Sequence, residues 1–245
     1  RNIYLKEILL NTKTIQPNTR SFMEVILELF KDRIIDYKLI TPSSLSLINQ
    51  HKLSNVLSGF YFRSSIMNPT IPYSISIHLH NSFKVFTPTL GWSSYLLGML
   101  SNPLLKEYVG VDVINKVCST TRTIANKNNL TNDIRCVPSE DLWNDSVFLR
   151  KYKKYFDFIF FSPPYYQLEL YPGVKQSTNR YKTYNDWLEG YWRQTMKLCQ
   201  HVLKKNKYMF FIISGYNHKN NYVDLETDLN RICKEEKFRY IKKYQ

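Results

Sequence analysis

From residue 83 onward, short apolar stretches alternate with stretches whose apolar residues recur at helical spacing. We expect strands at residues 83–87, 108–111, 134–137, 156–161, 208–213 and 238–244, and helices at residues 93–100, 114–128, 184–204 and 223–235. Apolar strands that alternate with helices usually form a parallel sheet whose two faces are both covered. The alternation therefore predicts an α/β fold with a mostly parallel, Rossmann-like sheet and helices on both faces.

The first part of the chain has a different pattern. Residues 1–60 have the character of helices joined by polar connections, and the stretch 21–35 carries apolar residues at helical spacing. A loop-like stretch with two prolines follows at residues 68–72. We expect a mainly helical N-terminal extension at residues 1–60 and one α/β domain at residues 61–245.

The chain is strongly basic, with a formal net charge of +14 and a pI near 9.5. Residues 143–245 carry 19 Lys and Arg against 10 Asp and Glu, so most of the excess lies in this part. A basic surface of this kind suits a polyanionic partner. The alternative is a solvated basic surface without such a partner.

The four cysteines, Cys118, Cys136, Cys199 and Cys233, are scattered and have no spacing typical of metal ligands. We expect reduced thiols, no metal site and an intracellular protein, cytoplasmic or nuclear. No apolar run reaches the length that spans a membrane, and no signal peptide is visible, so no membrane partner is expected.

The strand expected at residues 156–161 runs directly into Ser162-Pro163-Pro164-Tyr165. Proline lacks an N–H group and has a fixed φ, so two prolines end the strand and leave carbonyl oxygens without a ladder partner. These carbonyls and the Ser162 hydroxyl could accept both protons of a planar exocyclic amine, while the Tyr165 ring stacks on its base. The alternative is an ordinary turn that ends a strand.

Three other strand ends carry groups that suit a nucleoside. The turn after the first strand, residues 86–94, contains Gly91 and opens a helix, so its backbone could approach a cofactor closely. Asp112 follows the second strand, where a carboxylate can accept hydrogen bonds from both hydroxyls of a ribose. The third strand precedes Ser139-Glu140-Asp141, whose oxygens could accept from an adenine amino group. A solvated acidic helix cap is the alternative for either acid.

Taken in order, these segments resemble the motifs of S-adenosylmethionine-dependent DNA amino-methyltransferases from phages, plasmids and large viruses. The resemblance rests on Phe-Thr-Pro-x-x-Gly-Trp-Ser-Ser at 86–94, Tyr-Val-Gly-Val-Asp at 108–112, Pro-Ser-Glu-Asp at 138–141 and Ser-Pro-Pro-Tyr-Tyr at 162–166. It covers roughly residues 60–245 and implies a class I methyltransferase fold with a seven-stranded, mostly parallel sheet. S-adenosyl-L-methionine is the cofactor that the resemblance implies.

The resemblance also implies roles for individual residues. Ser162, Pro163, Pro164 and Tyr165 would form the catalytic site. The cofactor would be bound by Phe62, Arg63, Ser64, Phe86, Thr87, Pro88, Gly91, Trp92, Asp112, Val113, Ser139, Glu140 and Asp141.

The implied reaction is methyl transfer to the exocyclic amino group of a base in DNA, with adenine N6 preferred and cytosine N4 the close alternative. An aryl amine is a poor nucleophile, and hydrogen bonds to the Ser162 side chain and the Pro163 carbonyl would favour the pyramidal nitrogen of the transition state. Tyr165 would stack on a base rotated out of the duplex. RNA is an alternative substrate, because the motifs do not distinguish a duplex from a folded strand.

Aromatic and basic residues interleave in the segment 171–193. We expect Lys175, Arg180 and Lys182 to contact nucleic acid, and the aromatic residues from Trp187 onward to pack on the sheet. The partner is therefore expected to be DNA, with RNA as the alternative, and a homo- or hetero-oligomer is left open.

The sequence also departs from the family pattern. Thr87 stands where an acid is usual, and Ser93 and Ser94 stand where glycines are usual. The turn at residues 203–207 lacks the usual glycines as well. These departures keep a second class of function open, a catalytically silent subunit that binds nucleic acid and supports an active partner.

Overall fold

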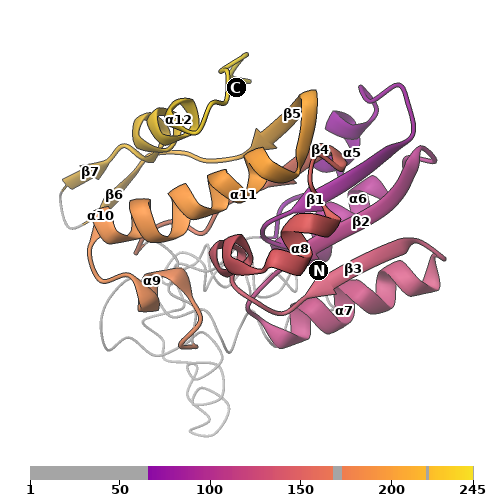
Figure 1. Ribbon diagram of the computed structural model, residues 1–245, viewed down its shortest axis with the longest axis horizontal. Helices are drawn as coiled ribbons and strands as arrows, with labels where there is room; N and C mark the ends of the chain where they lie inside the picture. The colour runs from indigo at the N-terminus through magenta and orange to yellow at the C-terminus, as the bar shows by residue number, and fades with distance from the viewer. Residues whose placement is uncertain (1–65, 168–172, 219–220, 245) are drawn as a thin grey trace, which may run out of the picture. The chain divides into compact units, whose positions relative to one another are not determined.

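The computed structural model describes residues 66–167, 173–218 and 221–244 (Figure 1). One compact unit comprises residues 66–166 and 174–245. The expected helical extension at residues 1–60 lies outside the described residues, as do Phe62, Arg63 and Ser64.

A five-stranded parallel sheet forms the centre of this unit. Its strands are β1 (Phe83–Thr87), β2 (Leu105–Val111), β3 (Thr131–Arg135), β4 (Phe156–Phe161) and β5 (Leu203–Phe211), in the order β3-β2-β1-β4-β5 (Figure 1). The order reverses at β1, so the strands that follow β1 in the chain lie on its two sides. This is the arrangement of a doubly wound α/β fold, and the predicted Rossmann-like class is confirmed.

Helices cover both faces of the sheet. Adjacent residues of a strand point to opposite faces, and Phe160 and Phe161 of β4 show the two environments. The ring of Phe160 contacts Tyr95 of α6 (Ser94–Met99) at 5.1 Å between centroids. The ring of Phe161 contacts Trp192 of the π-helical turn η5 (Leu188–Arg193) at 5.8 Å. Both phenylalanines are fully buried.

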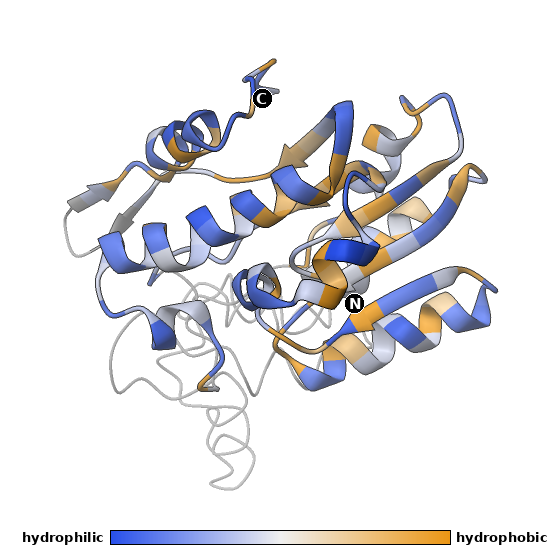
Figure 2. Ribbon diagram, in the orientation of Figure 1, coloured by the Kyte–Doolittle hydropathy of each residue, from blue (hydrophilic) through white to orange (hydrophobic). Residues whose placement is uncertain are grey.

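The remaining helical segments lie before, between and after the strands. They are α5 (Thr70–Ser76), η3 (Gly91–Ser93), α7 (Asn115–Lys127), η4 (Ser139–Asn144), α8 (Ser146–Lys151), α9 (Ser177–Arg180), α10 (Tyr184–Trp187), α11 (Gln194–Val202) and α12 (Leu225–Glu235). Figure 2 shows the hydrophobic colour gathered on the central strands, whereas α7 carries both colours along its length. This is the expected pattern for buried strands under amphipathic helices.

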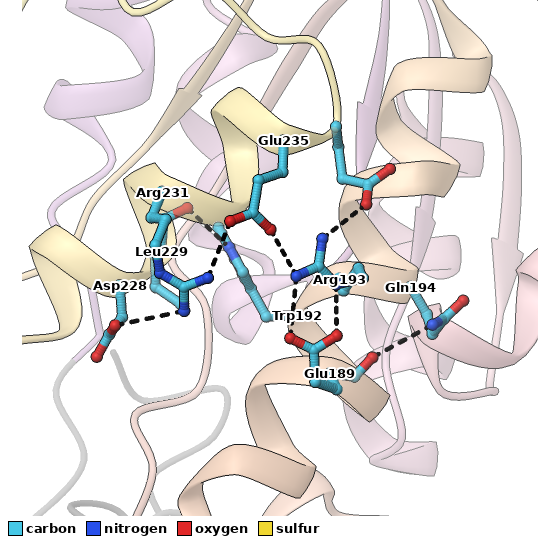
Figure 3. A network of polar contacts seen from close by, with 9 residues as sticks. Glu189, Trp192, Arg193, Gln194, Asp228, Leu229, Arg231 and Glu235 are labelled. Atoms are coloured by element: carbon cyan, nitrogen blue, oxygen red, sulfur yellow. Dashed lines mark hydrogen bonds and ion pairs between the residues drawn. The ribbon is translucent and has the colours of Figure 1, made fainter.

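Polar contacts fasten α12 to η5 (Figure 3). The indole Nε1 of Trp192 donates to the carbonyl of Leu229 at 3.1 Å. Arg193 forms ion pairs with Glu189 on its own turn and with Glu235 and Glu236 on α12. These contacts fix the helical segment that follows the Ser-Pro-Pro-Tyr motif.

The sheet is smaller than the seven strands that we expected. Residues 238–244, predicted as the last strand, form none, and Tyr240, Ile241 and Tyr244 are exposed. As a strand, the segment would place Lys242 on the side of Tyr240 and Tyr244, and Arg239 and Lys243 on the side of Ile241, so neither side would be continuously apolar. β6 (Tyr216–His218) and β7 (Asn221–Val223) pair with each other as a separate antiparallel sheet.

Two further differences concern element boundaries. Residues 68–72, expected as a loop, lead into α5. The expected turn at residues 203–207 lies inside β5 as a bulge, because Leu203 pairs with Phe156 while Tyr208 pairs with Phe158. Within the described part of the chain, no helix has both the length and the apolar character needed to cross a bilayer.

Candidate active site at the carboxyl ends of the strands

The carboxyl ends of β1 and β4 lie side by side where the strand order reverses. The Thr89 hydroxyl, in the turn after β1, donates to the carbonyl oxygen of Ser162 at 3.0 Å. The Ser162 N–H donates to the phenolic oxygen of Tyr95 on α6, also at 3.0 Å. The first βα turn and the Ser-Pro-Pro-Tyr motif are therefore one connected site, at the place where ligands bind in open α/β sheets.

Ser162 is oriented by the neighbouring strand. Its hydroxyl donates to the backbone carbonyl of Ile212, just after β5, at 3.0 Å. Because a hydroxyl has one hydrogen and two lone pairs, this bond uses the donor and leaves the oxygen able to accept. Ser162 is half-buried, so its oxygen is not sealed in the core.

The Tyr165 side chain is held in place at its hydroxyl group. Its phenolic oxygen accepts a hydrogen bond from the N–H of Ser214 at 2.8 Å, and its ring lies 6.0 Å from the ring of Tyr216. Pro163 is buried, whereas Pro164 and Tyr165 are half-buried. The motif therefore ends the strand and also holds a partly exposed aromatic ring beside the Ser162 hydroxyl.

The turn after β1 has an unusual backbone. Gly91, Trp92 and Ser93 have φ angles of 53°, 55° and 62°, all in the left-handed region. A Cβ at Gly91 would lie 2.0 Å from Cζ of Tyr95, so only glycine fits there. Ser93 thus adopts a conformation that glycine favours, at a cost of about 1–2 kcal/mol. Ser94 has φ −63° and is helical, so its departure from the family pattern carries no such strain.

Phe86 and Thr87 are two of the residues predicted to bind the cofactor, and their side chains face the core. Phe86 is fully buried against Phe148 and Phe156. Thr87 is also fully buried, and its hydroxyl donates to the Tyr108 hydroxyl at 3.2 Å. Any contact from these two residues to a ligand would therefore come from the backbone.

Pro88 and Trp92 are buried, the latter with 8% of its surface exposed.

Asp112 links the second strand to the first turn. Its Oδ2 accepts from the Leu90 N–H and its Oδ1 from the Ile114 N–H, both at 3.1 Å. Burial raises the pKa of Asp112, although the N–H groups of Ile114, Leu90 and Val113 oppose this shift. Each carboxylate oxygen keeps lone pairs for further donors. Val113, beside it, is half-buried.

The loop after β3 brings a buried acid into the same region. Glu140 is only 5% exposed, and its Oε1 lies 2.8 Å from a guanidinium nitrogen of Arg180. Burial raises the pKa of Glu140 to about 7, which outweighs the lowering by Arg180. Asp141 is exposed and pairs with the other terminal nitrogen of Arg180 at 2.7 Å. The buried Ser139 hydroxyl shares a 3.0 Å hydrogen bond with the Thr195 hydroxyl.

Arg180 therefore occupies a different position from the one expected of a phosphate contact. Its guanidinium is paired with Glu140 and Asp141, so it is less available to a phosphate than an unpaired arginine. Lys175 and Lys182, the other two predicted contacts, are exposed. Trp187, Tyr191 and Trp192 are buried, which confirms the prediction that the aromatic residues from Trp187 onward belong to the core.

The sequence analysis did not identify four residues that contact the candidate site: Thr89, Tyr95, Ile212 and Tyr216. Tyr95 lies four residues after Gly91, and this helical spacing together with the glycine is the signal that could have indicated it. Ile212 acts only through its backbone carbonyl, so its residue type carries no information. Among the described residues, no cluster of three His, Cys, Asp or Glu side chains could hold a metal ion.

No family model matches this sequence, and no curated protein is similar to it. Several solved structures resemble it weakly. The [4+2]-cyclase SpnF aligns with a TM-score of 0.46 and 11% identity, covering 69% of this chain and 56% of that protein. A SAM-dependent methyltransferase from Agrobacterium tumefaciens aligns with a TM-score of 0.45 and 10% identity, covering 72% of this chain and 52% of that protein. PH0226 from Pyrococcus horikoshii aligns with a TM-score of 0.42 and 15% identity, covering 68% of this chain and 78% of that protein.

The chain spans about half the length of the first two of these proteins. Likenesses at such low identity concern the fold, and the functional argument rests on the residues of the site.

Proposed function

We propose that this chain transfers a methyl group from S-adenosylmethionine to the exocyclic amino group of a base in DNA, with adenine N6 as the preferred acceptor. The observation that carries the proposal is the hydrogen bond from the Ser162 hydroxyl to the Ile212 carbonyl. It leaves the Ser162 oxygen as an acceptor, in a motif joined by hydrogen bonds to the turn after β1. The two N–H groups of an exocyclic amine need hydrogen-bond acceptors in this place, not a donor.

The residues after the first three strands suit an adenosine-containing cofactor. Asp112 offers carboxylate lone pairs to ribose hydroxyls, and Glu140 offers a buried acceptor to an adenine amino group. The tight turn at Gly91 permits close approach of the backbone. When bound, S-adenosylmethionine supplies a methyl group on a sulfonium, which is electrophilic.

The chain's own residues position the acceptor. The Ser162 oxygen and the Pro163 carbonyl would accept the two amine protons and stabilise the pyramidal nitrogen more than the planar one. The Tyr165 ring, fixed at its hydroxyl by Ser214, would stack on the base. Ser162 is neutral and is a weak base, so the released proton would pass to water.

Charge supports a nucleic-acid substrate. The net charge of +14 favours a polyanion, and Lys175 and Lys182 are exposed in the segment after the motif. Cytosine N4 and RNA adenine N6 are the alternatives within the same chemistry.

A second candidate function is a catalytically silent subunit that binds nucleic acid. Two observations favour it: Trp92 and Ser93 have left-handed φ angles, which glycines would adopt without strain, and Thr87 is buried. The turn at residues 86–94 also carries no charged side chain. The acceptor geometry at Ser162 favours the enzyme.

Nucleoside mass spectrometry tests the proposal. Mixed-sequence DNA is incubated with the protein and S-adenosylmethionine that carries a deuterated methyl group, and the digested nucleosides are analysed. We expect deuterated N6-methyldeoxyadenosine with the wild type and with Tyr165→Phe, which keeps the ring. Tyr165→Ala should lower the yield by about 10²–10³-fold, as expected when positioning of the base is lost. Equal yields from wild type and Tyr165→Ala would reject the site, and label on deoxycytidine alone would move the acceptor to cytosine N4.

A further inference from the structure

Tyr191 carries a buried hydroxyl that the fold does not use. The residue lies on the π-helical turn η5 and is 2% exposed. Its hydroxyl oxygen has no hydrogen-bond partner among residues 66–167, 173–218 and 221–244. Burying a polar group without a partner costs free energy, so such a group in a folded protein calls for an explanation.

The surroundings of this hydroxyl are those of the candidate site. η5 packs against η4, the turn that carries Glu140. Burial raises the pKa of Tyr191 well above its ordinary value, and the groups that add to this shift are Glu140, Cys199, Tyr95 and Asp112. Three of these four belong to the strand-end site: Asp112 after β2, Glu140 after β3, and Tyr95, which binds the Ser162 N–H.

The ring cannot easily turn away. It lies 5.2 Å from the ring of Trp187 and 6.4 Å from the ring of Trp192, and both tryptophans are fully buried. The next residue toward the N-terminus, Gly190, accepts a hydrogen bond from the Tyr181 hydroxyl at 3.0 Å. The π-helical turn therefore holds the phenol in place, and such turns occur often at functional sites.

A neutral phenol beside an acid forms a complementary pair of groups. The phenol keeps its proton, so it can donate, while the carboxylate of Glu140 can accept. An adenine presents the opposite pattern along one edge, an amino donor next to a ring nitrogen that accepts. The pair therefore matches the edge of an adenine base in polarity.

We propose that the Tyr191 hydroxyl donates a hydrogen bond to a ring nitrogen of the cofactor's adenine. This nitrogen lies next to the amino group from which Glu140 accepts a hydrogen bond. Tyr191 is then a specificity residue for the base of the nucleoside held by Asp112. This inference rests on the proposed function, because it assumes an adenosine-containing cofactor.

The chain offers a matched control in Tyr216. It is the other residue in the described part of the chain with a buried hydroxyl that lacks a partner. Its ring lies beside Tyr165, and besides burial only Tyr166 raises its pKa. Tyr216→Phe and Tyr191→Phe therefore remove the same kind of group, the first on the side of the acceptor base and the second on the side of the cofactor.

The first measurement compares stability and binding in the purified protein. Tyr191→Phe and Tyr216→Phe should both raise the melting temperature of the free protein, because each removes a buried hydroxyl without a partner. Calorimetry with S-adenosylhomocysteine should show that Tyr191→Phe weakens binding by about 3- to 10-fold, the worth of one hydrogen bond, while Tyr216→Phe leaves it unchanged. A purely structural role of Tyr191 would not separate stability from affinity in this way.

The second measurement identifies the atom. S-adenosylhomocysteine analogues in which carbon replaces ring nitrogen 1 or ring nitrogen 7 are titrated against wild type and Tyr191→Phe. For one of the two analogues the wild type and the variant should bind equally, because the acceptor is gone. If Tyr191→Phe weakens all three ligands by the same factor, or none of them, the inference is wrong.

The failure of this inference can be told from the failure of the proposed function. If the wild type binds S-adenosylhomocysteine and Asp112→Ala weakens that binding while Tyr191→Phe does not, only the role of Tyr191 is overturned. If the wild type does not bind the ligand at all, the cofactor assignment and the role of Tyr191 both fall.

Discussion

The hydroxyl of Ser162 donates a hydrogen bond to the backbone carbonyl of Ile212 at 3.0 Å. The bond connects the end of β4 to the end of β5 and fixes the direction of the only hydrogen on that oxygen. Ser162 is thereby set up as an acceptor, which is the role that an amine substrate requires.

Replacing Ser162 tests this role. Ser162→Ala removes the acceptor and should lower methyl transfer by about 10²-fold, the low end for loss of one preorganised polar group. Ser162→Thr keeps the oxygen and should retain most of the activity. Affinity for S-adenosylmethionine, measured by calorimetry, should change in neither variant. Full activity of Ser162→Ala would show that the side chain takes no part in the transition state.

Gly91→Ala tests the coupling between the first turn and the catalytic motif. The added Cβ would lie 2.0 Å from Cζ of Tyr95, and Tyr95 binds the Ser162 N–H. We expect a loss of about 3 kcal/mol or more in the free energy of unfolding, from overpacking and left-handed strain together. Gly173→Ala is the control, because Gly173 has φ 115° but no atom of the described residues lies within 4 Å of an added Cβ. Its cost should be strain alone, about 1–2 kcal/mol. Equal losses of unfolding free energy in the two variants, measured by urea unfolding, would mean that the Tyr95 side chain moves to make room for the new methyl group.

Glu140 predicts a pH dependence of stability. Burial raises its pKa to about 7 in the folded protein, above the ordinary value of 4.5. The folded state therefore holds this proton more tightly than the unfolded state, and the contribution of Glu140 to stability is complete below about pH 4.5 and is lost as the pH rises through about 7. In Glu140→Gln, the decrease in unfolding free energy between these pH values should become smaller.

Asp141→Asn is the matched control for that experiment. Asp141 also pairs with Arg180 and is exposed, and its charge raises the pKa of Glu140 less than burial does, so Asp141→Asn should keep most of the pH dependence between 4.5 and 7. Urea unfolding at several pH values measures all three proteins. The same slope in wild type and Glu140→Gln would show that the acid is ionised throughout this range.

The salt dependence of DNA binding tests the basic surface. Lys175 and Lys182 are exposed, whereas Arg180 is paired with two acids. If both lysines contact phosphates, replacing the two together should reduce the log–log slope of affinity against salt by about two. Arg180→Gln should reduce it by less than one, since its charge is already opposed. An unchanged slope in the double lysine variant would place the nucleic-acid surface elsewhere.

Much of the fold follows from local pattern, and the exceptions have physical reasons. β1 and β4 begin and end at the predicted residues, and the prolines that follow them explain where their apolar runs end. β3 begins three residues earlier than expected, at Thr131. It is an edge strand with polar residues, and its Asp133 is satisfied by Arg135 and by the Tyr152 hydroxyl, which no periodicity reveals.

For the candidate site, too, some features could be predicted from the sequence and others could not. Asp112, Glu140 and Ser162 could be predicted to lie near one another, because the carboxyl ends of parallel strands meet at one edge of a sheet. Their partners could not be predicted. The pairing of Arg180 with Glu140 joins residues 40 apart, and the Ser162–Ile212 bond joins residues 50 apart, so both depend on how the completed elements pack.

The most direct test of the central claim is a calorimetric titration with S-adenosylmethionine. Asp112→Ala removes the carboxylate that would accept the ribose hydroxyls. Its control is Asp145→Ala, because Asp145 also accepts from two backbone N–H groups, those of Val147 and Phe148, but at the start of α8. We expect one site in the wild type, binding weakened by about tenfold or more in Asp112→Ala as two charge-assisted hydrogen bonds are lost, and unchanged binding in Asp145→Ala. Absence of binding by the wild type, alone or with DNA, would contradict the account.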